Sequence, residues 1–169
     1  MVGLAAELAG GSLAGARVGV LGLAFKAGTD DVRDSPALAV TAAVAALGAS
    51  VTAYDPAAAV RAARVLPGIR YAGSVTDAAA DAHVLLVLTD WPEFAELDPA
   101  ELGRVVARRA VADGRHALDG SRWRAAGWSY GILGGYLEQA SGEHRDRRMK
   151  LRAAEPARRG ATGGLPAAG

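Results

Sequence analysis

The sequence contains no cysteine among its 169 residues. Disulfides, thiolate metal sites and a cysteine nucleophile are therefore excluded for this chain. Aromatic residues are also scarce, at 5%, and the remaining composition is that of a water-soluble globular protein. No apolar run approaches the ~20 residues that span a bilayer, and the first residues lack the basic segment of a signal peptide. We therefore expect a cytoplasmic protein without a membrane partner.

A large excess of charge of one sign is absent as well, because the formal net charge is only +1. The charge is unevenly distributed: residues 1–141 carry −3 and residues 142–169 carry +4. The body of the protein is therefore no general polyanion binder, and we expect no nucleic-acid partner. The final segment is rich in Gly, Ala, Pro and Arg without periodicity, and we predict that residues 142–169 form a disordered basic tail.

Short apolar segments alternate with helical patterns over residues 17–134. Strands are predicted at 17–21, 50–54, 69–71, 84–88, 110–112 and 128–133, and helices at 36–47, 57–65, 74–80, 99–108 and 119–127. This alternation predicts βαβ units with right-handed crossovers. The fold class is therefore α/β, a single Rossmann-like domain with a doubly wound parallel sheet between two helical layers. Residues 1–16 are predicted to form a short helix, ended by Gly10 and Gly11, and a linker.

The stretch from Arg17 to Pro36 organises the rest of the chain. It begins with an apolar strand, continues into a charged loop and ends with Ser35-Pro36, which is typical of a helix start. Similar polar clusters follow two later strands, at Thr89-Asp90-Trp91 and at Asp113-Gly114-Arg115. In an open α/β sheet such strand ends converge on one edge, where ligands bind. Lys26, Arg33 and Arg115 are therefore expected near one another, and three cations suit a diphosphate.

The glycine pattern argues against a complete dinucleotide site in this domain. It is Gly19-x-x-Gly22-x-x-Phe25 rather than G-x-G-x-x-G, so Phe25 and Lys26 occupy the place where bare backbone would meet a pyrophosphate. Asp55, at the end of the second strand, is then mainly a cap for the next helix. Metal-ligand spacing is absent, so no metal site is predicted, and no residue is assigned a catalytic role.

Five blocks together resemble the C-terminal domain of the UDP-glucose/GDP-mannose dehydrogenases, and the first two resemble the signature that opens it. They are Gly22-Leu-Ala-Phe-Lys26, Thr29-Asp-Asp-Val-Arg33 with Ser35-Pro36, Tyr54-Asp55-Pro56, Thr89-Asp90-Trp91 and Asp113-Gly114-Arg115. They occur in the family's order and at similar spacing, over roughly residues 10–134. The resemblance implies a UDP-binding domain, with residues 1–16 as the end of a long central helix and its linker.

The resemblance also implies roles for individual residues. Phe25, Lys26 and Arg115 would contact the nucleotide-sugar substrate, and Arg33 would reach NAD bound mainly by a missing N-terminal domain. Where the family usually has Asn or Arg after this arginine, the chain has His116. Asp30 and Asp31 are interpreted as loop-ordering carboxylates, and all three tryptophans as core residues.

The function implied is that of part of an NAD-dependent UDP-glucose 6-dehydrogenase, which converts UDP-glucose to UDP-glucuronate in polysaccharide biosynthesis. The family's chemistry passes through a covalent intermediate on a cysteine of the central domain, so this chain is not expected to turn over alone. A separate chain carrying the NAD-binding and central domains would be its partner. Alternatives are a non-catalytic nucleotide-binding module, a truncated remnant, or the domain of a UDP-N-acetylmannosamine or GDP-mannose dehydrogenase. A free-standing NAD(P) enzyme is disfavoured by the glycine pattern.

Overall fold

The computed structural model describes residues 1–134, in which one parallel sheet has the strand order β3-β2-β1-β4-β5-β6. The strands are β1 (Arg17–Leu21), β2 (Ser50–Tyr54), β3 (Arg70–Tyr71), β4 (Val84–Val87), β5 (Ala110–Asp113) and β6 (Ser129–Ile132). The helices are α1 (Val2–Ala9), α2 (Pro36–Ala46), α3 (Ala59–Val65), α4 (Val75–Ala79), α5 (Pro92–Ala95), α6 (Pro99–Leu102) and α7 (Gly120–Ala125).

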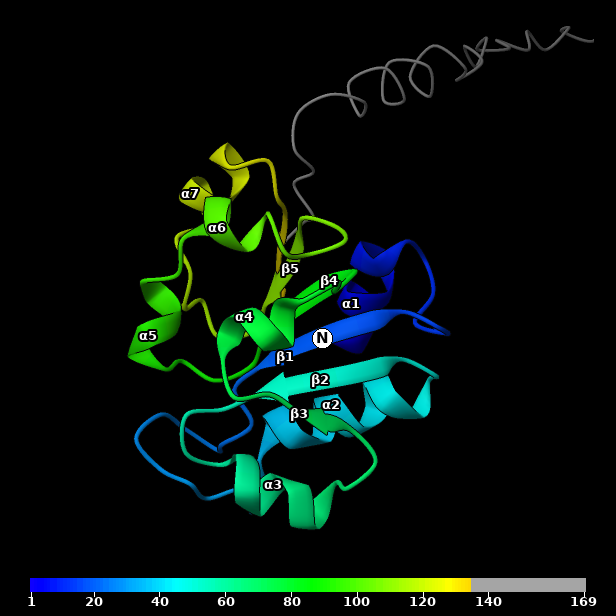
Figure 1. Cartoon of the computed structure of the whole chain (residues 1–169), viewed down its shortest axis with the longest axis vertical. Coiled ribbons are helices and arrows are strands. Elements are labelled where there is room, and N and C mark those ends of the chain that lie inside the picture. The colour runs from blue at the N-terminus through cyan, green and yellow to red at the C-terminus, as the bar shows by residue number, and fades with distance from the viewer. Residues whose placement is uncertain (135–169) are drawn as a thin grey trace, which may run out of the picture.

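The sheet is covered by helices on both faces (Figure 1). Side chains alternate between the faces of a strand, so Val18 and Val20 of β1 pack with α1, α2 and α3 in one core cluster. Leu21 belongs to a second cluster with α4, α5, α6 and α7 on the opposite face. The central strand β4 is buried at every position, as expected of a parallel strand covered on both sides. The predicted three-layer α/β fold is therefore confirmed.

The helix predicted at 99–108 is wrong in length, because α6 ends at Leu102. The next residues form tighter turns, in which Arg104 N–H donates to the Glu101 carbonyl at 3.0 Å. The Val105 carbonyl then accepts from Asp81 N–H at 2.8 Å, so this segment is hydrogen-bonded to the loop before β4 instead of continuing the helix. Helix α5 was not predicted, since four residues are too few to show a period.

The N-terminal helix α1 packs on the sheet through Ala5 and Leu8, which are buried in the first core cluster. It ends at Gly10 with a φ of 110°, as the Gly10-Gly11 pair predicted. Its origin as the end of a longer central helix stays a prediction. The predicted basic tail, 142–169, lies outside the described residues.

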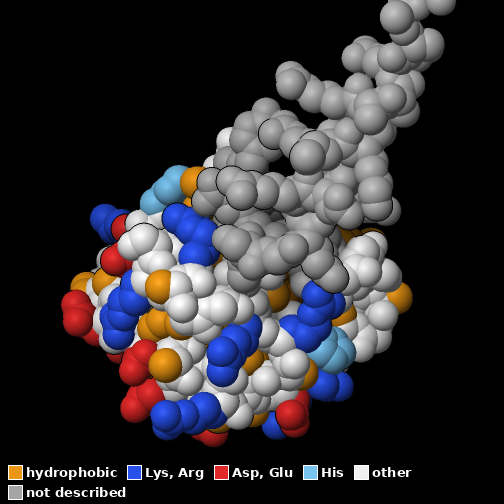
Figure 2. Space-filling model, turned by 90° about the horizontal axis from the view of Figure 1, so that it is seen from above, with side chains coloured by type: hydrophobic (Ala, Val, Ile, Leu, Met, Phe, Trp, Pro, Cys, Tyr) orange, Lys and Arg blue, Asp and Glu red, His pale blue; other side chains and the backbone are white. Residues whose placement is uncertain are grey.

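On the face seen in Figure 2, the Lys and Arg side chains are scattered, while Asp and Glu lie mainly along its left and lower edges. Within the described residues, none of the helices has the length and apolar character required to cross a membrane.

Candidate functional site

The strand order reverses between β1 and β4, which are hydrogen-bonded neighbours. The chain leaves β1 toward α2 on one face of the sheet and leaves β4 toward α5 on the other. Such a switch point opens a crevice at the carboxyl ends of the strands, where ligands bind in open α/β sheets. The loops that follow β1, β4 and β5 are therefore the candidate site, as the sequence predicted.

Gly22 forms the turn that follows β1, and this turn packs against the end of β4. Its φ is 93°, and a Cβ atom here would lie 2.5 Å from the Thr89 Cβ. The Thr89 hydroxyl donates to the Ala24 carbonyl at 2.9 Å, so the strand end and the loop are joined directly. Glycine is required here by both the backbone conformation and the space.

Asp55 holds this loop from the end of β2. Its Oδ2 accepts from Leu23 N–H at 2.7 Å and from Ala24 N–H at 2.9 Å. Its Oδ1 accepts from the N–H groups of Ala57 and Ala58, at 2.9 and 2.7 Å. Asp55 is buried, so these bonds replace its hydration. Asp55 thus holds the turn between β2 and α3, whereas the N-cap residue of α3 itself, Ala58, has no side-chain capping bond. Asp55 also bridges to the β1 loop, which sequence reasoning missed.

Phe25 and Lys26 lie at the outer part of the loop, and both are exposed. Phe25 N–H donates to the Asp31 carbonyl at 2.8 Å, which closes the loop behind them. Among the described residues Lys26 makes no hydrogen bond or ion pair, so its ammonium is free to meet an anion. Phe25 is 48% exposed, so its ring presents an apolar surface next to Lys26 in the sequence.

Arg33 forms a two-pronged ion pair with Asp31. Its Nε lies 2.9 Å from Oδ1, and its Nη2 lies 2.7 Å from Oδ2. Together with the Arg33 backbone N–H, the guanidinium holds the pKa of Asp31 well below its usual range. Asp30 pairs with Arg61 of α3 at 2.6 Å. These contacts agree with the interpretation of both carboxylates as loop-ordering groups.

Asp113 organises the loop after β5 as Asp55 organises the loop after β1. It is fully buried. Its Oδ1 accepts from Arg115 N–H at 3.0 Å and Ala117 N–H at 3.2 Å. Its Oδ2 accepts from Leu118 N–H and from the Tyr130 hydroxyl, both at 2.9 Å. The loop that carries Arg115 therefore has a fixed backbone.

Burial and the bond to the Asp113 carboxylate both raise the pKa of Tyr130 well above its usual range. The phenol therefore stays protonated and acts as a donor to Asp113.

The Arg115 guanidinium crosses to the β4 loop, where Nη2 lies 3.6 Å from the Asp90 carboxylate. The three predicted cations thus all follow strand ends on one edge, but the described contacts pair Arg33 and Arg115 with separate carboxylates. Direct proximity of the three to one another stays a prediction.

The tryptophans differ in their surroundings. Trp123 and Trp128 are buried and pack edge to face, with ring centroids 4.6 Å apart. Trp91 is only partly buried, and its indole N–H donates to Asp55 Oδ2 at 3.2 Å. The interpretation as core residues therefore holds for Trp123 and Trp128. Trp91 packs against the same core cluster from the edge and also contacts Asp55 at the candidate site.

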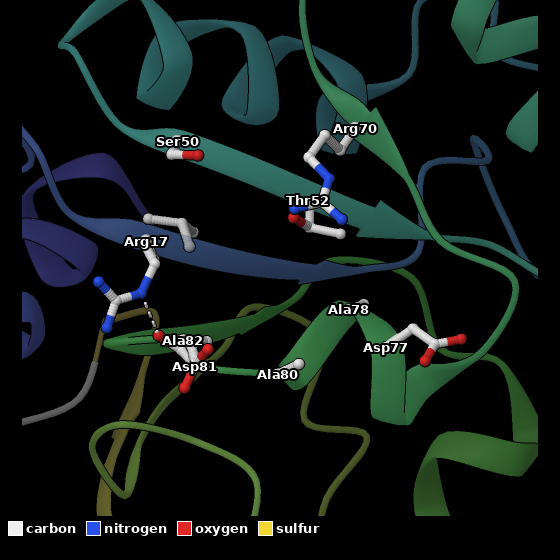
Figure 3. A pocket seen from close by; sticks show the side chains of 10 residues that line it. Arg17, Ser50, Thr52, Arg70, Asp77, Ala78, Ala80, Asp81 and Ala82 are labelled. Carbon is white, nitrogen blue, oxygen red and sulfur yellow. Dashed lines mark hydrogen bonds between the residues drawn. The ribbon is translucent and has the colours of Figure 1, made fainter.

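A separate hollow of about 270 Å³ lies at the amino-terminal side of the sheet, on the α4 face. Figure 3 shows Arg17, beside Asp81, at one end of it and Arg70, beside Thr52, at the other. Asp77 and Asp81 belong to its lining together with the two arginines, so the hollow offers no net charge to an ionic ligand. It lies away from the strand ends that carry Lys26 and Arg115, and we assign it no part in the site.

The residues present do not fit a dinucleotide in the usual Rossmann position. The Leu23 and Ala24 N–H groups that follow Gly22 already donate to the Asp55 carboxylate. That carboxylate accepts five hydrogen bonds in all, which leaves it no capacity for a ribose hydroxyl. Arg33 remains 85% exposed and can reach a group held outside this domain. In residues 1–134, moreover, no three His, Cys, Asp or Glu side chains gather closely enough to hold a metal ion.

The fold and the strand-end loops are those of the Rossmann-like class of nucleotide-binding domains. The loop after β1 differs from the usual G-x-G-x-x-G pattern of that class. Comparison with known sequences agrees with this class. The UDP binding domain of the UDP-glucose/GDP-mannose dehydrogenase family matches residues 19–120. The chain belongs to this family.

Two curated relatives illustrate the similarity. The UDP-glucose 6-dehydrogenase of Rhizobium meliloti is 38% identical over 126 residues, which are 75% of this chain and 29% of the relative. The UDP-glucose 6-dehydrogenase AglM of Haloferax volcanii is 48% identical over 106 residues, 63% of this chain and 24% of the relative.

A solved UDP-glucose dehydrogenase from Pyrobaculum islandicum superimposes with a TM-score of 0.65 at 34% identity, covering 77% of this chain and 28% of that one. The chain thus spans between about a quarter and a third of the length of the proteins it matches.

Proposed function

We propose that this domain binds the UDP portion of a UDP-sugar at the rim formed by residues 22–35 and 113–118. The observation that carries the proposal is that two buried carboxylates fix the backbones of these loops while Lys26 stays unpaired and exposed. A rim with a fixed backbone and a free cation is pre-organised for a phosphate, because little ordering remains when the ligand arrives.

In this proposal Lys26 and Arg115 contact the diphosphate. Lys26 acts as a compact charge, whereas Arg115 exchanges its 3.6 Å contact with Asp90 for a phosphate or offers its remaining N–H groups. Phe25 supplies an apolar surface beside them and becomes covered when the ligand binds.

The parent activity that we propose is that of an NAD-dependent UDP-glucose 6-dehydrogenase, of which this chain provides the UDP-binding part. The chain has no cysteine, so it cannot itself form the covalent intermediate of that chemistry. NAD would be held mainly by another domain, and Arg33 would contact it from this one. A separate cytoplasmic chain carrying the NAD-binding and central domains would complete the enzyme.

Calorimetric titration of the purified chain with UDP, UDP-glucose, GDP and NAD tests the proposal. We expect UDP and UDP-glucose to bind and NAD to show no binding. Lys26→Ala and Arg115→Ala should each weaken UDP binding by about 1–3 kcal/mol, the scale of a charge-assisted contact. Arg104→Ala is the matched control, because this exposed arginine follows α6 and lies outside both loops.

Each outcome separates the candidates. Loss of affinity in the two rim variants but not in Arg104→Ala supports the site. Tighter binding of GDP than UDP would indicate the domain of a GDP-mannose dehydrogenase, and binding of NAD alone would overturn the proposal. Binding of no nucleotide would favour a truncated remnant.

A further inference from the structure

We propose that Asp55 is the positioning residue of the nucleotide rim: its carboxylate sets the backbone that presents Phe25 and Lys26 and couples this loop to the one that carries Arg115. This inference rests on the proposed function. Asp55 does not touch the ligand, because its oxygens are already occupied and it is only 4% exposed.

The first step of the argument is the number and direction of the bonds. Five N–H donors from three strand ends converge on one carboxylate: two follow β1, two follow β2, and one is the Trp91 indole after β4. An ionised carboxylate has only acceptor sites and suits this arrangement. An asparagine would turn an NH2 group toward some of these donors.

The second step is the position of the held backbone. Leu23 and Ala24 immediately precede Phe25 and Lys26, so the two bonds to Oδ2 set where the substrate-facing pair begins. The same short segment is held from the other side, because the carbonyl of Ala24 accepts from Thr89 and that of Leu23 accepts from Ser35 at 2.7 Å. Removing the Asp55 carboxylate therefore frees the N–H groups of Leu23 and Ala24, while their carbonyls stay hydrogen-bonded. We expect these peptide groups to tilt and the loop to stay folded.

The third step is a connection across the switch point. Oδ2 accepts the Trp91 indole N–H at 3.2 Å, and the neighbouring residue, Asp90, faces Arg115 at 3.6 Å. The two halves of the rim, one after β1 and one after β5, are thus linked through Asp55, Trp91 and Asp90. A ligand that binds one half should be sensed at the indole of Trp91.

A double-mutant cycle tests this role. UDP affinity is measured by calorimetry for the wild type, Asp55→Asn, Lys26→Ala and the double variant, together with the melting temperature of each. We expect Asp55→Asn to weaken UDP binding about tenfold, the change that corresponds to one contact of about 1.4 kcal/mol. We also expect Lys26→Ala to have little further effect in that background, because the lysine is no longer in place. A merely structural aspartate would lower the melting temperature but leave the dependence on Lys26 intact.

If Asp55→Asn does not fold, Trp91→Phe provides the test instead. This variant removes one of the five donors to Asp55 and leaves the carboxylate in place. It should weaken UDP binding about threefold with little change in melting temperature. Trp128→Phe is the matched control: it also deletes an indole bond, to the Pro99 carbonyl at 2.9 Å, but in the core. It should lower the melting temperature and leave UDP affinity unchanged.

The indole N–H signals in NMR spectra give an independent readout, because the chain has three tryptophans. Addition of UDP should move the Trp91 signal and leave those of Trp123 and Trp128 in place. If the wild type binds no UDP, the proposed function fails, and this inference falls with it. If the wild type binds UDP but Asp55→Asn and Trp91→Phe bind equally well, or if the cycle is additive, the inference alone is overturned.

Discussion

Replacing Asp113 by asparagine removes one charge and one acceptor from a fully buried position. The two carboxylate oxygens of Asp113 each accept two hydrogen bonds. The amide of asparagine keeps one oxygen, so it can serve only one of these pairs. We expect the oxygen to stay with Leu118 N–H and the Tyr130 hydroxyl, because these two groups are buried and have no access to water.

The remaining donors, Arg115 N–H and Ala117 N–H, then face an NH2 group. Both bonds are only partly buried, so water can reach their donors, and each lost bond costs about 1 kcal/mol. The free energy of unfolding should therefore fall by roughly 2 kcal/mol. Asp113→Ala should cost more, because it also leaves the two buried donors without acceptors, each at about 1–3 kcal/mol.

Urea denaturation followed by circular dichroism measures this change. With an m-value of about 2 kcal/mol/M, the midpoint should fall by about 1 M while the m-value stays constant. Tyr130→Phe is the companion variant: in the Asp113→Asn background its effect should persist, since the asparagine oxygen still accepts from the hydroxyl. An unchanged or higher midpoint in Asp113→Asn would refute the reasoning, because it would mean that burying the carboxylate costs as much as its four bonds return.

Three further predictions concern other parts of the fold. Gly22→Ala should destabilise the protein by at least about 3 kcal/mol in the same denaturation assay, because its Cβ would meet Thr89 at a positive φ; a loss below about 1 kcal/mol would contradict the geometry. Ser35→Ala should cost about 1–2 kcal/mol, since this residue caps α2 and its hydroxyl donates to the Leu23 carbonyl, and Ser35→Thr, which keeps the hydroxyl, should recover part of the loss. Stability should fall above about pH 10, because tyrosine ionises there in the unfolded chain, whereas the pKa of Tyr130 is raised in the folded state. Melting curves of Tyr130→Phe should show a smaller decline over that pH range, and an identical decline would exclude Tyr130 as its source.

Most of the fold could be predicted because its strands are short apolar segments flanked by turn residues. The pattern failed where an element was too short to show a period, as in α5, or where tertiary bonds ended a helix, as at Val105. No local signal marks such a bond, because its partner, Asp81, lies far away in the sequence.

The candidate site could be predicted only in part, because local motifs mark single residues and not the contacts between distant ones. Sequence motifs identified Lys26 and Arg115, and the structure places both in strand-end loops, but the bridge from Asp55 to the β1 loop went unnoticed. The sequence did contain a signal for this bridge. If β1 and β2 pair in parallel with Leu21 opposite Tyr54, then Asp55, which follows β2, must lie beside the turn at Gly22. Reading that register requires the strand order first, which local motifs do not contain.

The position of β1 in the sheet has a consequence for how the protein is made. Val18 pairs with Val51 on one side and with Val84 on the other, so β1 has both neighbours only after β4 has left the ribosome. Until then the nascent chain can form β1, β2 and β3 but exposes an apolar strand edge, the kind of surface on which chains aggregate. Synthesis pauses between β3 and β4 would prolong that exposure, and cells producing this domain would depend most on chaperones during that interval.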